Sequence, residues 1–265
     1  MSQSENQNPA TPVVLLGASN LTMGFPLILE NLLACLPNPV DVFAALGHGR
    51  SFGMWSRVLF RHLPGILQSE LWSHLKDRTQ TANARPKLLI TDIGNDLIYG
   101  APVPNIMNWI EECLERVKAT PGETVLTLPP VDSIDSLSRW RFRLMKSLIF
   151  PGRKVSLEEI RQSAHDLASH IEALGKSRGI AVVRPERTWY GIDPIHLRKR
   201  YRSESWKTIL SHWSGFDVAR WGDHATPTIR REFRQARFAH RRIFGRDQFC
   251  RQPACQTERF TLWLS

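Results

Sequence analysis

Short apolar runs alternate with longer helical patterns through the first three quarters of the chain. Apolar residues recur at helical spacing between these runs, as in 21–36 and 105–119. Buried strands of parallel sheets are near-continuous apolar runs, and helices usually connect such strands. The alternation therefore predicts an α/β fold with a parallel sheet that is covered on both faces. Five runs are predicted as strands: 12–17, 40–49, 87–96, 124–130 and 180–186.

Two further segments before residue 197 are predicted as helical. The segment 54–75 has the apolar spacing of one or two helices. The segment 155–179 is predicted as one long helix, with Ser156 and Glu159 at the spacing of a capping box and a terminal glycine. With these helices, the five strands account for most of the chain up to residue 196.

Length and composition are those of a soluble globular protein. The 265 residues suffice for one large α/β domain or for a domain with an appendage, and 42% are apolar and 23% charged. No run approaches the length of a membrane span, and the start of the chain lacks the basic and apolar regions of a signal peptide. We therefore expect a flexible N-terminus over residues 1–11 and a cytoplasmic location.

Positive charge is concentrated in the last quarter of the chain. Residues 1–196 contain 20 Lys and Arg against 19 Asp and Glu, whereas residues 197–265 contain 15 against 6. This shift predicts a boundary near residue 197, with a domain over 12–196 and a basic, mainly helical extension over 197–265. Within the extension, 228–246 has seven arginines, one acid and apolar residues at helical spacing.

This basic segment has several interpretations. Its arginines could be solvated on a helix that docks on the sheet domain. They could instead bind an anionic partner, either nucleic acid, acidic lipid or acidic glycan, or the segment could form a lid over the site. The oligomeric state is not indicated by the sequence.

The cysteines indicate neither a disulfide framework nor a metal site. The chain has four, too few and too scattered for a disulfide scaffold, and only Cys250 and Cys255 lie close together. No second pair of Cys or His residues stands at ligand spacing. We therefore expect no metal and no cofactor.

Polar residues follow three of the predicted strands. Ser19 follows the first, Gly49 the second and Asn95 the third, while Asp193 and His196 come shortly after the fifth. The carboxyl ends of parallel strands share one sheet edge, so these residues can converge on one crevice. Each has a simpler interpretation when taken alone: Ser19 as a helix N-cap, and the segments around Asn95 and His196 as ordinary turns.

The order of these segments resembles that of the SGNH (GDSL-type) hydrolases. The matching segments are "GAS", "GHGRS", "GND" and "DPIH". The resemblance implies a three-layer α/β/α sandwich with a flavodoxin-like, five-stranded parallel sheet. It also implies that Ser19 is the nucleophile, His196 the general base and Asp193 the residue that orients His196. The implied oxyanion hole consists of the backbone N–H groups of Ser19 and Gly49 and the side-chain amide of Asn95.

Several features depart from the family pattern. Ala18 stands where the family usually has an aspartate, which removes a polar support beside the nucleophile, and 69 residues follow His196 instead of only a few. His48 is an alternative base by residue type, although a strand-end side chain without a catalytic role is the simpler interpretation. Trp189 and Tyr190 could line an acyl or sugar pocket, or could simply pack in the core.

Two classes of function follow. The first is a serine esterase that hydrolyses a small ester through an acyl-enzyme intermediate, with acyl transfer by the same site as a variant. The second is a catalytically weak SGNH-like module that binds an anionic partner through its basic tail. The complete set of site residues favours the first, and Ala18 and the tail favour the second.

Overall fold

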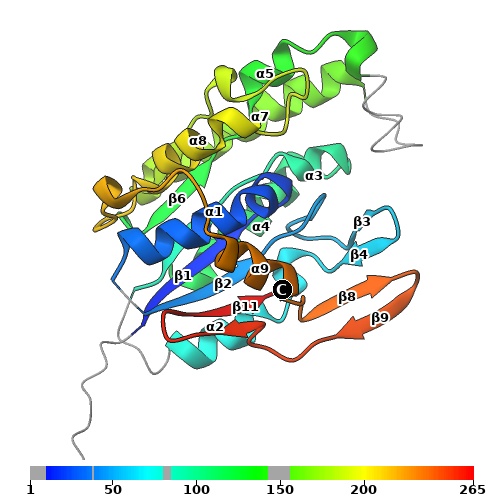
Figure 1. Cartoon of the computed structure of the whole chain (residues 1–265). Helices are drawn as coiled ribbons and strands as arrows, with labels where there is room; N and C mark the ends of the chain where they lie inside the picture. Colours follow the sequence, from blue (N-terminus) through cyan, green and yellow to red (C-terminus); the bar gives the residue numbers. More distant parts are fainter. Residues whose placement is uncertain (1–9, 38, 80–84, 143–155) are drawn as a thin grey trace, which may run out of the picture.

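A seven-stranded sheet runs through the middle of the molecule in the computed structural model (Figure 1). The structure describes residues 10–37, 39–79, 85–142 and 156–265. Neighbouring strands are parallel except at the β10–β11 pair. In spatial order the strands are β10 (Cys255–Gln256), β11 (Phe260–Leu264), β2 (Val40–Ala45), β1 (Thr11–Leu16), β5 (Lys87–Ile90), β6 (Thr124–Thr127) and β7 (Ala181–Val183).

The five predicted strands are confirmed, and they lie in the flavodoxin-like order. In sequence order they are β1, β2, β5, β6 and β7, and in space the second lies outside the first. The sheet has two more strands than predicted, because the C-terminal β11 pairs in parallel with β2 and β10 pairs with β11. The fold class implied by the sequence, a three-layer α/β/α sandwich, is confirmed with this difference in strand count.

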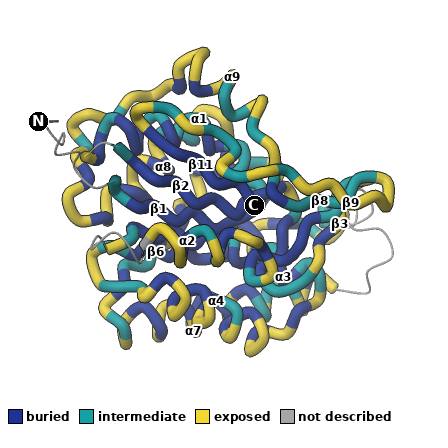
Figure 2. Tube along the Cα trace, turned by 90° about the horizontal axis from the view of Figure 1, so that it is seen from below, coloured by how far each residue is buried: buried dark blue, intermediate teal, exposed yellow. Residues whose placement is uncertain are grey.

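Helices cover both faces of the sheet (Figure 2). Successive residues of a strand point to opposite faces, and in β1 Val13 and Leu15 belong to one core cluster while Val14 and Leu16 belong to the other. One face carries α1 (Ser19–Cys35), α8 (Arg202–Leu210) and α9 (Pro227–Gln235). The other carries α2 (Leu71–Thr79), α4 (Val103–Val117) and α7 (Leu157–Arg178).

Shorter helices lie in the connections. Two are α-helical, α3 (Asn95–Ile98) and α5 (Val131–Asp135), and 3₁₀ turns occur at Ile66–Gln68, Arg187–Trp189, Lys199–Tyr201 and Val218–Arg220. The capping box predicted for α7 is present, because the Ser156 hydroxyl accepts from the Glu159 N–H at 3.1 Å and the Glu159 carboxylate accepts from the Ser156 N–H at 2.7 Å. The first residue predicted for this helix, 155, lies outside the described residues, as do residues 1–9 of the expected N-terminal tail.

The prediction of helix over 54–75 is wrong in its first part. Residues Ser56–Val58 (β3) and Arg61–Leu63 (β4) form a β-hairpin, and the helix α2 begins only at Leu71. The hairpin forms because β4 pairs with β8, about 180 positions later in the chain. Such a distant pairing leaves no trace in the local spacing of apolar residues.

The prediction of a helix over 228–246 is also wrong beyond its first half. The helix α9 ends at Gln235, and residues His240–Ile243 (β8) and Arg246–Phe249 (β9) form a second hairpin. The two hairpins join edge to edge into a four-stranded sheet, β3-β4-β8-β9, which we call the small sheet. The extension is therefore mixed in structure instead of mainly helical, and its strand β11 completes the main sheet.

Candidate active site

Ser19 stands at the first turn of α1, directly after the carboxyl end of β1. The N-cap of this helix is Ala18, and its side chain makes no capping hydrogen bond. The Ser19 hydroxyl lies 2.9 Å from Nε2 of His196. The serine side chain therefore contacts an imidazole instead of capping the helix, which separates the two interpretations that the sequence had left open.

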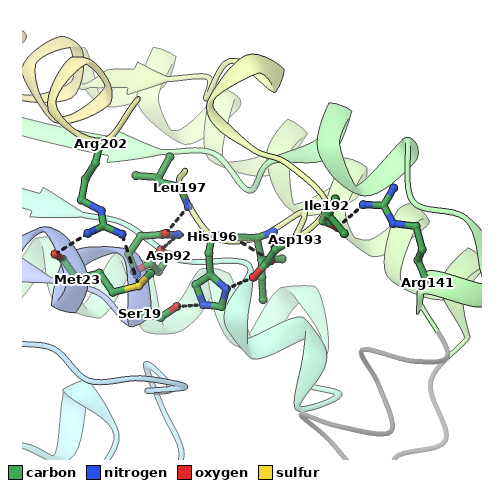
Figure 3. Close-up of polar contacts among 11 residues, drawn as sticks. Ser19, Met23, Asp92, Arg141, Ile192, Asp193, His196, Leu197 and Arg202 are labelled. Atoms are coloured by element: carbon green, nitrogen blue, oxygen red, sulfur yellow. Dashed lines mark hydrogen bonds and ion pairs between the residues drawn. The ribbon is translucent and has the colours of Figure 1, made fainter. Parts of the chain in front are cut away.

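Asp193 holds His196 in place through both of its oxygens (Figure 3). One oxygen accepts from the backbone N–H groups of Ile195 and His196 at 3.0 and 3.2 Å, which fixes the turn. The other lies 2.5 Å from Nδ1 of His196. This contact places the proton on Nδ1 and leaves Nε2, which faces Ser19, able to accept one.

The surroundings of the pair shift both pKa values in the direction that strengthens it. Burial opposes protonation of His196, but the hydrogen bond and charge of Asp193, together with the charge of Asp92, raise its pKa above the ordinary value. Burial raises the pKa of Asp193, but the hydrogen bond and charge of His196 outweigh it, so that the net pKa is lowered. Asp193 is therefore ionised over the pH range in which His196 gains or loses its proton.

Asp92 is the residue of this site that the sequence had not indicated. It follows β5 in the left-handed region, with φ at 60°. One carboxylate oxygen accepts from the backbone N–H groups of Ala18, Asn20 and Leu21 at 2.8, 3.1 and 3.2 Å. These N–H groups at the start of α1 have no intrahelical partners, so Asp92 caps the helix that carries Ser19.

Asn20 connects the nucleophile segment to the histidine loop. Its amide nitrogen donates to Asp92 and to the carbonyl oxygen of Ile195, at 2.8 Å in both cases. Its amide oxygen accepts from the backbone N–H of Leu197 at 2.9 Å. The residues before and after His196 are thus fixed to the residue that follows Ser19, and this sets the distance between the two catalytic candidates.

The loop after β2 is held by Asn95 and Asp96 at the start of α3. The Asn95 amide donates to the carbonyl oxygen of Arg50 at 2.9 Å, and the Asp96 carboxylate accepts from the Phe52 N–H at 2.9 Å. Burial raises the pKa of Asp96 to about 6, although hydrogen bonds from Ser51 and Phe52 oppose the rise. The "GND" segment therefore positions the neighbouring loop in addition to presenting the Asn95 amide at the sheet edge.

Position 49 of this loop has room and a suitable backbone conformation for glycine alone. Its φ of 65° favours glycine, and an added Cβ would lie 2.5 Å from Cγ2 of Val58 and 2.9 Å from the hydroxyl of Tyr99. That hydroxyl donates to the Gly49 carbonyl oxygen at 2.6 Å. Within the described residues, the backbone N–H groups of Gly49 and Ser19 have no hydrogen-bond partner, so both can donate to a substrate.

An apolar cavity of about 110 Å³ opens beside Ser19 and Asn95. A single water occupies roughly 10–15 Å³ of such a cavity, so this space can hold a group of several heavy atoms. Both Trp189 and Tyr190 line it, as the sequence had suggested among its alternatives. Further apolar lining comes from the end of β6, from α5 and from the first turns of α7: Leu128, Pro129, Pro130, Ile134, Leu137, Leu157 and Ile160.

The remaining candidates take no part in these hydrogen bonds. The ring of His48 is exposed and has no hydrogen-bond partner within the described residues. Partial desolvation and the positive charges of Arg61 and His196 lower its pKa. The described parts of the chain contain no group of three or more His, Cys, Asp or Glu side chains arranged to hold a metal ion. They also contain no helix that is long and apolar enough to cross a membrane.

A scan against protein-family models and a search of curated proteins find no match. A search of solved structures finds a gut microbial diltiazem-metabolizing enzyme, 13% identical with a TM-score of 0.45, over 77% of this chain and 46% of that longer one. It also finds a GDSL-like lipase from Bacteroides thetaiotaomicron, 12% identical with a TM-score of 0.45, over 76% and 86%. A carbohydrate acetylesterase family member from Sinorhizobium meliloti is 15% identical with a TM-score of 0.47, over 76% and 99%. At these values the likeness concerns the fold and says nothing about activity.

Proposed function

We propose that the protein is a serine esterase whose nucleophile is Ser19. The observation that supports this most is the pair of contacts through His196, 2.9 Å to the Ser19 hydroxyl and 2.5 Å to Asp193. A serine hydroxyl is a weak nucleophile until an adjacent base takes its proton, and that base must be held in the correct tautomer. Ser19 comes from a segment far from the turn that holds Asp193 and His196, and the alignment of the three is not needed to form any helix or strand.

The reaction proceeds in two steps through an acyl-enzyme. The Ser19 oxygen attacks the ester carbonyl carbon while Nε2 of His196 takes the hydroxyl proton, and the carbonyl oxygen becomes an oxyanion. The N–H groups of Ser19 and Gly49 and the Asn95 amide donate to this oxyanion, each contributing about 2.7–4 kcal/mol in comparable sites. The C–O bond then breaks, and the leaving alcohol takes the proton from His196.

The second step releases the acid. Water attacks the acyl carbon and gives a proton to His196, the bond to Ser19 breaks, and the proton returns to the serine oxygen. The substrate proposed is an ester with an apolar acyl group, because the cavity beside Ser19 is lined mainly by Leu, Ile, Pro and aromatic side chains. A simple acetyl group would leave most of that cavity to water.

The test combines covalent labelling with turnover. A fluorophosphonate probe is expected to label the wild type on the peptide that contains Ser19, and Ser19→Ala is expected to abolish both labelling and hydrolysis of p-nitrophenyl esters. The matched control is Ser211→Ala, because the Ser211 hydroxyl is exposed and bonds only to the carbonyl oxygen of Thr208. If Ser19→Ala retains most of the turnover, or the label is on another residue, the proposal is wrong. A wild type that is neither labelled nor active would favour the binding-module hypothesis.

A further inference from the structure

Large apolar side chains are exposed mainly on the small sheet. Within the described residues seven are exposed, and five of them lie on this sheet or directly before it: Trp55, Leu59, Phe60, Phe244 and Phe249. Scattered exposed apolar residues are ordinary, but a group on one element indicates a binding surface. Figure 1 shows that the small sheet extends away from the main sheet on the side of the strand carboxyl ends.

The turns of the two hairpins carry large apolar residues at positions where such residues are unfavourable. Leu59 is 78% exposed with φ at 55°, and Phe244 is 76% exposed with φ at 49°. Left-handed backbone costs a residue other than glycine roughly 1–2 kcal/mol, and Gly, Asn and Asp are the residues that such turns prefer. The folding of the hairpins therefore does not account for Leu59 and Phe244.

The two turns form one patch. The Phe244 N–H donates to the carbonyl oxygen of Phe60 at 3.0 Å, which fixes the turns side by side. The rings of Phe60 and Phe244 stack with centroids 4.6 Å apart and an interplanar angle of 12°. We call Leu59, Phe60 and Phe244 the hairpin patch. It is a rigid apolar surface because both of its turns belong to the same hydrogen-bonded sheet.

The flanks of the hairpin patch are strongly basic. The segments 55–63 and 237–251 contain seven arginines and a single acid, Asp247. That acid already bonds to Arg242 at 3.0 Å and to His240 at 3.0 Å. Arg246 follows the turn of Phe244, is exposed, and has no partner in the described part of the chain. The small sheet and its ends therefore carry an excess of positive charge that their single acid does not neutralise.

We propose that the hairpin patch docks on an anionic lipid surface. An apolar tip that inserts between headgroups, flanked by arginines that attract them, matches both the exposed hydrophobic surface and the charge. A second copy of the chain is disfavoured, because two such patches would bring their arginines together. A nucleic acid is disfavoured, because Leu59 has no ring and the rings of Phe60 and Phe244 already stack on each other, which leaves fewer ring faces for bases.

Docking at the hairpin patch places the candidate active site close to the lipid. Val58, next to Leu59, lies against Gly49, since an added Cβ on Gly49 would come within 2.5 Å of it. An ester whose apolar acyl chain lies in the membrane could therefore reach Ser19 over a short path. This link to substrate rests on the proposed esterase function, whereas docking itself does not require catalysis.

The experiment is flotation of the full chain with vesicles. Wild type is expected to float with phosphatidylcholine vesicles that contain about 30% phosphatidylglycerol and to float much less with phosphatidylcholine alone. The double variant Leu59→Asn with Phe244→Asn is expected to bind at least about tenfold less, because two large apolar groups no longer insert. Asparagine tolerates a positive φ, so the turns are retained. Arg246→Gln is expected to weaken binding by about fivefold.

Two matched variants test whether position matters. Trp140→Asn removes an exposed aromatic residue outside the small sheet, and Lys176→Gln removes an exposed charge near the end of α7, so both are expected to float as wild type does. Ser19→Ala is also expected to float normally, which separates a failure of docking from a failure of the esterase proposal. The melting temperature of the double variant, compared with that of wild type, shows whether the double variant is folded.

Any of the following four results would overturn the docking proposal. The double variant could float as well as wild type, or wild type could fail to float with anionic vesicles. Wild type could also bind single-stranded RNA but not vesicles, which would indicate a nucleic-acid surface. A dimer in sedimentation that the double variant abolishes, without flotation of the wild type, would show that the patch pairs with a second copy.

Discussion

Asp92 accepts a hydrogen bond from the side-chain amide of Asn20 at 2.8 Å, and this contact joins the end of β5 to the residue after the candidate nucleophile. The other oxygen of Asp92 accepts from the N–H of Ala18 at 2.8 Å. Ala18 stands where the SGNH pattern that the sequence resembles has an aspartate. A carboxylate from a different strand thus supplies polar support at that point, and the loss implied by Ala18 is offset in space.

Asp92→Asn is expected to lower turnover by about a hundredfold with a small effect on KM. The amide keeps one acceptor but loses the charge that interacts with the N-terminus of α1, and its NH₂ group faces N–H donors. Because the charge of Asp92 helps to raise the pKa of His196, the acidic limb of the kcat/KM profile is also expected to move to lower pH. Both quantities come from pH-dependent ester hydrolysis.

The control for Asp92 is Asp41→Asn. Asp41 is a buried carboxylate that pairs with Arg78 away from the site. It is expected to leave the pH profile unchanged even if it lowers the melting temperature. An Asp92→Asn protein with wild-type turnover and an unshifted profile would show that Asp92 serves only to hold the helix.

The pH dependence of activity is expected to follow His196. As the base, His196 must be neutral, and its raised pKa means that activity appears as pH rises through a value above the ordinary 6.5 or so. Asp193→Asn is expected to lower turnover by up to about 10⁴ and to shift this limb to lower pH, because the amide removes the contact that favours the charged imidazole.

A loss of less than tenfold in Asp193→Asn would mean that another group orients the histidine. His48→Gln is the matched control, because His48 is exposed near the site but has no hydrogen-bond partner among the described residues. Its removal is expected to leave the acidic limb where it is. A profile that loses this limb in His48→Gln would instead identify His48 as the base.

The sequence predicted what depends on local pattern. Buried parallel strands are apolar runs, so the five strands were visible, and Ser19, Asn95 and His196 could be placed at one edge because strand direction fixes the side of the sheet. The capping box of α7 was visible because its two partners, Ser156 and Glu159, are three residues apart.

What the sequence did not predict depends on distant partners. The spacing of Ile229, Phe233 and Ala236 is helical, and α9 forms there, but the strand that follows pairs with β9 and with the distant β4. Asp92 was overlooked for the same reason, since the N–H groups that it accepts from lie more than 70 positions earlier. An acid at the end of a strand, beside a helix start without a polar cap, is the signal that could have identified it.

The length of the acyl group that the cavity accepts is expected to depend on Ile134. This residue of α5 lines the cavity that begins at Ser19. Ile134→Phe adds volume to the wall, so hydrolysis of p-nitrophenyl octanoate is expected to fall several-fold relative to that of the acetate. Ile134→Val, which adds no volume, serves as the control. An unchanged ratio of octanoate to acetate turnover in Ile134→Phe would place the acyl chain elsewhere.

Gly49→Ala is expected to abolish most of the activity while Tyr99→Phe has a smaller effect. The new Cβ would meet Val58 and the Tyr99 hydroxyl in a backbone with φ at 65°, so the loop and its N–H group must move. Tyr99→Phe leaves the backbone of the loop in place and removes the hydrogen bond to the Gly49 carbonyl oxygen. Turnover and melting temperature, measured together, separate the two effects, and an active Gly49→Ala protein would exclude this N–H group from the oxyanion hole.

The C-terminal strand is expected to be required for both the fold and the site. β11 covers the edge of β2, where Trp263 stacks on Phe43 with centroids 4.5 Å apart. The fully buried guanidinium of Arg50 donates to the carbonyl oxygens of Ser265, Leu46 and Pro64, and the carbonyl oxygen of Arg50 in turn holds the Asn95 amide. A charged group without such partners in the core is costly; burial already lowers the pKa of Arg50 to about 9.

Deletion of residues 257–265 is therefore expected to give an insoluble or unfolded protein, although these residues lie beyond the charge boundary near residue 197. Trp263→Ala is a milder change than the deletion. It is expected to lower the free energy of unfolding, measured by urea denaturation, by about 3–5 kcal/mol. Phe249→Asn, which changes an exposed aromatic residue of β9, is expected to leave that free energy nearly unchanged. A deleted protein that remains folded and active would show that residues 12–196 and the part of the extension that is left form a stable unit, and that β11 is an accessory strand.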